Sequence, residues 1–199
     1  MPLKKKFWIC SAITLAVLGT AASALYHNTE LGHLISQKSY YDFSDGTFTT
    51  EETYKKSNLI QNPDGSSVVY EDNYGFLISS VTHTNPENVS ITESLYSKEQ
   101  DSNRTAPNTF RKVSEIYDKK GTLLVRCEVS AVFDCTQLPA TVSDLTGDIT
   151  YTAEGYTVSD CSFAASDADC VLYRFTLSQQ DTSNQYTVQL SSDARGTIS

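Results

Sequence analysis

The sequence predicts a mainly β protein, an antiparallel sandwich or a curved half-barrel with one short N-terminal helix and two disulfides. Runs of Thr, Val, Ile, Tyr and Phe recur along the chain, and these residues favour strands. The composition includes twelve Tyr but one Met and one Trp, which is typical of extracellular β-domains. Turn-forming pairs separate the runs, because Gly accepts the positive φ that short hairpins require. These pairs are Asp45-Gly46, Asp64-Gly65, Lys120-Gly121, Gly147-Asp148 and Arg195-Gly196.

A basic and then apolar segment opens the chain. Three lysines at residues 4–6 precede an uncharged run over residues 7–26, and an Ala-Ser-Ala sequence at residues 22–24 supplies the small residues of a signal-peptidase site. The pattern predicts a signal peptide over residues 1–24. The alternative is a signal anchor, because about 20 uncharged residues just suffice to span a bilayer. Residues 25–199 are then expected to form a single β-rich extracytoplasmic domain.

The start of that domain carries a helical pattern. Leu31, Leu34 and Ile35 have helical spacing within residues 25–38, which predicts a short helix. Further along, two polar and turn-rich segments interrupt the strand pattern. If the domain has subdomains, we expect the break near residues 98–108 or 136–146.

Four of the five cysteines lie between residues 127 and 170. In an oxidising compartment an even number of thiols predicts disulfides, here two. Three pairings are possible, and the local pairs Cys127–Cys135 and Cys161–Cys170 are favoured because short loops close at the lowest entropic cost. Their spacings do not match those of structural zinc sites, so no metal ligands are expected.

Charge and motifs exclude several function classes. The net charge of -9 includes no basic block beyond residue 6, which argues against a nucleic-acid partner. The sequence contains no nucleophile elbow, no zinc-protease motif, no phosphate-binding glycine loop and no dinucleotide fingerprint. We therefore expect no enzymatic activity, no catalytic residues and no cofactor.

Exposed tyrosines are the best candidates for a binding surface, because a tyrosine ring offers contact area at low entropic cost. Tyr40, Tyr41, Tyr70 and Tyr74 are the candidate binding face. The expected function is that of a secreted or cell-envelope binding module. Its partner would be a protein or a glycan at a cell surface, and it would touch a membrane only through an uncleaved N-terminal segment.

The β-meander with its Gly-containing turns and one early helix also resembles the half-barrel carriers of the LolA and LprG type. The resemblance covers the pattern of residues 25–199 and no specific motif. It implies an alternative function, the transport of a lipophilic small molecule inside a curved sheet.

Overall fold

The computed structural model describes residues 33–55, 59–61, 67–69, 75–98, 106–167 and 169–199. These residues form twelve β-strands and, within the described part, no helix. Seven strands form one antiparallel sheet in the order β1 (His33–Tyr41), β2 (Phe48–Lys55), β5 (Phe76–Thr84), β6 (Ser90–Ser97), β7 (Asn108–Tyr117), β8 (Leu123–Asp134) and β9 (Thr141–Thr152). A second sheet contains β10 (Thr157–Asp167), β11 (Cys170–Gln179) and β12 (Thr182–Ser191), and a two-stranded ribbon contains β3 (Leu59–Gln61) and β4 (Ser67–Val69). The prediction of a mainly β protein is confirmed.

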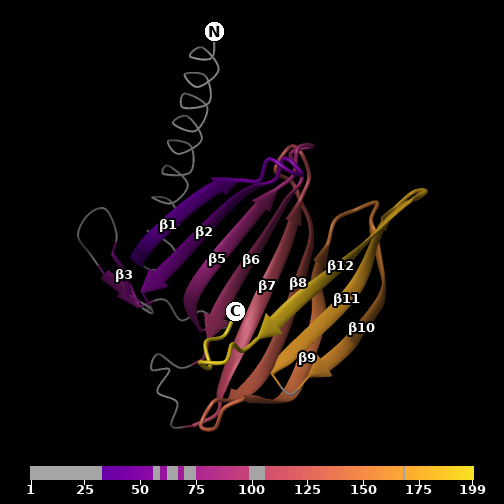
Figure 1. The fold of residues 1–199 in the computed structure, drawn as a ribbon. Coiled ribbons are helices and arrows are strands. Elements are labelled where there is room, and N and C mark those ends of the chain that lie inside the picture. The colour runs from indigo at the N-terminus through magenta and orange to yellow at the C-terminus, as the bar shows by residue number, and fades with distance from the viewer. Residues whose placement is uncertain (1–32, 56–58, 62–66, 70–74, 99–105, 168) are drawn as a thin grey trace.

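The seven-stranded sheet is a meander, as Figure 1 shows. Each strand pairs with its neighbour in the chain, except that β2 pairs with β5 past the β3–β4 ribbon. Short hairpin connections explain this order, because antiparallel strands need only a few residues between them. The three-stranded sheet lies in front of β7, β8 and β9 in Figure 1.

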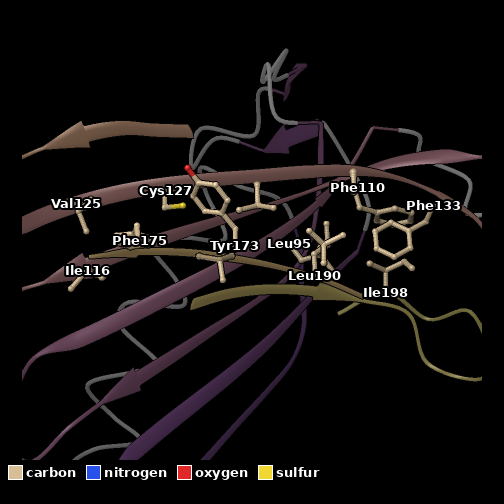
Figure 2. Packing of buried hydrophobic residues seen from close by; sticks show 14 of the residues in the cluster. Leu95, Phe110, Ile116, Val125, Cys127, Phe133, Tyr173, Phe175, Leu190 and Ile198 are labelled. Carbon is tan, nitrogen blue, oxygen red and sulfur yellow. The ribbon is translucent and has the colours of Figure 1, made fainter. Parts of the chain in front are cut away.

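The main hydrophobic core lies between these two sheets. In β8 every second side chain is buried, from Val125 through Cys127 and Val129 to Phe133, and none of these is more than 1% exposed. They pack against Val171, Phe175 and other buried residues of β11 and β12. Figure 2 shows Val125, Cys127, Phe133 and Phe175 among the side chains that meet between the layers. The alternation leaves the opposite face of the seven-stranded sheet free to carry polar residues.

Three predicted turns are confirmed, at Gly46, Gly121 and Gly196, where φ is 77°, 78° and 75°. Acidic side chains close the turns: Asp118 accepts hydrogen bonds from the backbone N–H groups of Lys120 and Thr122. The pair Asp64-Gly65 lies outside the described residues. The turn predicted at Gly147-Asp148 is wrong, because both residues lie inside β9.

The helix predicted over residues 25–38 is also corrected. Residues 33–38 belong to β1, which pairs with β2 along its length, and residues 25–32 lie outside the described part. Pairing with a neighbouring strand satisfies the backbone here and overrides the helical spacing of the apolar residues. The predicted signal peptide, residues 1–24, is likewise outside the described residues. The described part of the chain contains no helix that could span a membrane.

Neither predicted disulfide is formed in the structure, where all four described cysteines are thiols. Cys127 lies inside β8 and Cys135 directly follows that strand. Eight residues of extended chain separate their Cα atoms by about 26 Å, whereas a disulfide requires less than about 7 Å. Cys170 is directly opposite Asp167 in the β10–β11 ladder. Cys161 is six residues before Asp167 on β10, so it lies roughly 20 Å along the strand from the position that faces Cys170. The loop-entropy argument failed because these segments are extended strands rather than loops.

Candidate functional site

A partly enclosed groove of about 420 Å³ lies on the face of the seven-stranded sheet opposite the core. Its floor comes from β2, β5, β6 and β7. On β7, for example, the buried Ile116 points into the core, while its neighbours Glu115 and Tyr117 line the groove. Strand pleating therefore separates the two faces residue by residue.

Paired hydroxyl groups form the middle of the groove. Ser80 lies 3.2 Å from Ser94, Thr82 lies 3.0 Å from Thr92, and Thr84 lies 3.0 Å from Ser90, measured between side-chain oxygens. Each pair joins β5 to β6 at directly opposite positions, where side chains approach most closely. These three pairs are called the hydroxyl ladder below.

One end of the groove carries aromatic side chains. Phe48, Thr84, Ser90 and Tyr117 are directly opposite one another in successive strands, so they form a transverse row across the sheet. Phe48 and Tyr117 are half-buried and flank the outermost pair of the hydroxyl ladder. The hairpin connections β1–β2, β5–β6 and β7–β8 gather at this end, at the top of Figure 1. We call it the aromatic end.

The other end is apolar and closed. Tyr54, Leu77, Tyr96 and Val113 form a small buried cluster separate from the main core, and none of them is more than 8% exposed. A polar ligand in the groove would therefore be confined between this closed end and the aromatic end.

Two carboxylates lie in the groove, and each accepts a hydrogen bond from the tyrosine two residues later on its own strand. The Tyr54 hydroxyl donates to Glu52 Oε2 at 2.6 Å, and the Tyr117 hydroxyl donates to Glu115 Oε2 at 2.7 Å. Burial, and then the hydrogen bond to the neighbouring carboxylate, raises the pKa of both tyrosines far above the ordinary value. Both hydroxyls therefore stay protonated donors at neutral pH.

Further side chains hold the two carboxylates in place. Gln37 Nε2 donates to Glu52 Oε1 at 2.9 Å, and Arg126 approaches Glu115 Oε1 at 2.7 Å. Glu52 and Glu115 are the charged residues among the described side chains that line the groove, and no Lys or Arg is among that lining. The described lining can therefore supply hydrogen-bond acceptors and hydroxyl donors, but no cationic site for an anion.

The predicted binding face is divided by the structure. Tyr40 and Tyr41 are both exposed, but as successive residues of β1 they point to opposite faces of the sheet. Tyr41 is directly opposite Phe48 at the aromatic end, and its ring lies edge-on to Phe43 with centroids 5.0 Å apart. Tyr70 and Tyr74 lie outside the described residues.

A second hollow, of about 520 Å³, lies among β9, β10 and β11 and is lined by Cys161 and Tyr173. The buried Cys127 is nearby: burial raises the pKa of its thiol to about 12, with a smaller contribution from the Cys161 charge. A thiol with so high a pKa is a poor nucleophile at neutral pH. No group of three or more potential metal ligands occurs among the described residues.

Sequence reasoning missed the hydroxyl ladder. Its signal was present, since Ser80, Thr82 and Thr84 alternate along the sequence, as do Ser90, Thr92 and Ser94. Reading it as a site required knowing that these strands pair in this register with the hydroxyls on the non-core face.

Comparison with family models, curated proteins and solved structures returned no match for this chain. The functional argument therefore depends on the groove itself.

Proposed function

We propose that this protein is a non-enzymatic binding module of the cell envelope or the extracellular space, and that its ligand occupies the groove of the seven-stranded sheet. The observation that carries the proposal is the organised polar interior of the groove. Hydroxyl groups on an ordinary solvated sheet need not be aligned. Here three consecutive hydroxyl pairs lie in register, and they are flanked by two carboxylates, Glu52 and Glu115, that are fixed by hydrogen bonds.

The spacing of the carboxylates supports binding rather than hydrolysis. Glu115 lies on β7 and Glu52 on β2, three strand spacings away in the sheet order. Three spacings amount to about 14 Å, whereas the two carboxyl groups of a glycosidase are about 5–9.5 Å apart. Each carboxylate is also occupied by a tyrosine hydroxyl on its own strand, which favours a role in positioning donors.

One observation favours the alternative, a carrier of a lipophilic molecule. The closed end of the groove is apolar, with Leu77 and Val113 packed against two tyrosine rings. Those side chains are already buried against each other, however, and the accessible floor next to them carries hydroxyls. Burying an acyl chain on that floor would leave hydroxyl groups without water, which is unfavourable. The polar module is therefore the preferred function.

The proposed location follows from the N-terminal sequence pattern, three lysines followed by an uncharged run and Ala-Ser-Ala. Export would bring the four thiols of the domain into an oxidising compartment. The strand positions disfavour both local pairings, so any disulfide of the exported protein is expected to join cysteines of different hairpins.

Native mass spectrometry of the chain purified from its producing cells tests the proposal. We expect an adduct that dissociates on activation and is absent from the variant Thr82→Trp, in which the indole fills the hydroxyl ladder. Circular dichroism of the variant shows whether its sheet is intact. An adduct that Thr82→Trp retains would place the ligand elsewhere and overturn the proposal. An adduct with the mass of a lipid that is present on the wild type and absent from the variant would instead favour the carrier function.

A further inference from the structure

We infer that the ligand of the groove is a neutral oligosaccharide whose hydroxyls meet the hydroxyl ladder and whose sugar rings pack against the aromatic end. This inference depends on the proposed function and assigns the ligand its chemical class. It combines three properties of the groove: mixed hydrogen-bonding capacity, the sign of its charge, and the position of its aromatic rings.

The hydroxyl ladder offers both donors and acceptors, with acceptor sites in excess. Each serine or threonine hydroxyl has one donor and two acceptor sites, and the bond within a pair consumes one of each. The Ser80–Ser94 pair and the Thr82–Thr92 pair therefore each retain one donor and several acceptor sites. Successive pairs are two residues apart along the strands, or about 6.7 Å. A sugar hydroxyl can donate and accept at once, so a polyhydroxylated chain matches such a floor.

The charge of the described groove lining disfavours acidic ligands. Glu52 and Glu115 line it, and the described lining contains no lysine or arginine. Arg126 does reach Glu115, but its guanidinium is engaged there through both Nε and NH2. A phosphate, a sulfate or a uronic acid would meet like charge without a compensating cation, which costs binding energy. Charge therefore disfavours an anionic ligand, and the hydroxyl ladder and the aromatic end favour a neutral polyhydroxylated ligand over a cationic one.

The aromatic end provides surfaces for the apolar side of a sugar. Phe48 and Tyr117 are half-buried at either side of the Thr84–Ser90 pair, and the exposed Tyr41 adjoins Phe48. A pyranose ring presents C–H groups on its faces and hydroxyls on its edge, so it can stack on an aromatic ring while its edge contacts the hydroxyl ladder. Rigid aromatic side chains provide this contact at low entropic cost.

The geometry also disfavours a peptide ligand. Extended peptides are usually captured by pairing with a free strand edge. The four strands that line the groove are each paired on both sides, β2 with β1 and β5, and β7 with β6 and β8. The groove therefore offers side chains rather than backbone groups, and side-chain hydroxyls and rings are the chemistry that selects a sugar.

Tryptophan fluorescence provides a direct test. The chain contains a single tryptophan, Trp8, so in the full chain with Trp8→Phe the substitution Phe48→Trp places the sole indole at the aromatic end. The probes are the neutral hexasaccharides of cellulose, chitin, starch and xylan, with hexagalacturonate and oleate as the anionic and lipophilic alternatives. We expect a saturable change in fluorescence with at least one neutral hexasaccharide and none with hexagalacturonate or oleate.

Two matched pairs of serines distinguish the loss of a ligand contact from the general effect of removing hydroxyl groups. In the reporter chain, Ser80→Ala with Ser94→Ala removes one pair of the hydroxyl ladder. Ser178→Ala with Ser183→Ala removes an equivalent pair, 2.8 Å apart, from the exposed end of the β11–β12 hairpin. We expect the first double variant to weaken the Kd about tenfold, as for the loss of two modest hydrogen bonds, and the second to leave it unchanged.

The outcomes distinguish the inference from the proposed function. Saturation by hexagalacturonate or oleate alone overturns the neutral-sugar inference and leaves a binding groove in place. Equal Kd values for the two double variants would also overturn it, because the hydroxyl ladder would then not contact the sugar. The absence of any saturable response overturns the inference. If Thr82→Trp also leaves the native mass spectrum unaltered, the proposed function fails with it.

Discussion

Gly147 lies directly against the ring of Tyr173: a Cβ on Gly147 would stand 2.5 Å from Tyr173 Cε2 and 2.6 Å from Cδ2. Gly147 is in the middle of β9, opposite Val129 of β8, and Tyr173 belongs to β11 of the other sheet. The two sheets can therefore approach closely at this point only because residue 147 has no side chain.

Substitution of this glycine tests the packing of the sheets. We expect Gly147→Ala to lower the free energy of unfolding by about 1–3 kcal/mol, the usual effect of overfilling a core, as measured by urea denaturation. In a double-mutant cycle with Tyr173→Leu, the combined loss should be smaller than the sum of the single losses, because the smaller side chain makes room for the methyl group. If the losses in free energy of unfolding were additive, the Tyr173 ring would not be the reason that residue 147 must be glycine.

A second prediction concerns an ion pair on the core face. Lys112 Nζ lies 3.7 Å from Glu93 Oε2, and the two side chains are 11% and 26% exposed. Burial lowers the pKa of Lys112, and Glu93 partly offsets this. Glu93→Ala should lower the free energy of unfolding by about 3 kcal/mol, because it leaves a buried charge without its counter-ion. The double variant Lys112→Met with Glu93→Leu is the control and should be nearly neutral, since it removes both charges together and retains apolar side chains. Similar losses in both variants would contradict this account.

A third prediction is loss of stability at alkaline pH. Burial raises the pKa of the Tyr54, Tyr117 and Tyr173 hydroxyls, and raises that of the Cys127 thiol to about 12. In the unfolded chain tyrosine titrates near 10 and cysteine near 8.5. Because the folded values are higher, the stabilisation is complete below pH of about 8 and is lost as pH rises from there through 12.

Urea denaturation at a series of pH values from 8 to 11 measures this dependence. Tyr117→Phe retains the ring and removes the titrating hydroxyl, so its stability should decline less steeply with pH than that of the wild type. A wild-type stability that is constant over this range would show that the buried hydroxyls do not titrate as described.

The fourth prediction concerns the order in which the thiols react. Cys161 is exposed, whereas Cys127 is 0% exposed and has a raised thiol pKa, which lowers the fraction of reactive thiolate. Time-resolved alkylation of the reduced, folded protein, followed by peptide mass mapping, should find Cys161 modified first and Cys127 last. Mapping of the unreduced protein should find no Cys127–Cys135 bond. Detection of that bond would require β8 to be rearranged.

Much of the secondary structure was predictable from short stretches of sequence. The turns at Gly121 and Gly196 follow from the nature of glycine, and the strand composition led to the correct fold class. The same reasoning misread Gly147 as a turn residue. Glycine is required there because the ring of Tyr173, which is distant in sequence, lies against it. It also misread residues 33–38 as helical, because their partner strand was unknown.

The groove was less predictable than the fold. Tyr40 and Tyr41 were grouped on one candidate face; both are exposed, but successive residues of a strand face opposite sides. Assigning the hydroxyl ladder required the pairing of Thr82 with Thr92, which depends on the register of β5 against β6.

Local chemistry in the sequence determined that this chain forms strands and where several of them turn, because those preferences arise within a few residues. Only the tertiary structure decided which face of each strand the second sheet covers, that the cysteines are held apart along extended strands, and that hydroxyls from neighbouring strands face one another across the groove. Register and layer packing set these features, and a shift of one residue in register would turn every groove side chain toward the core.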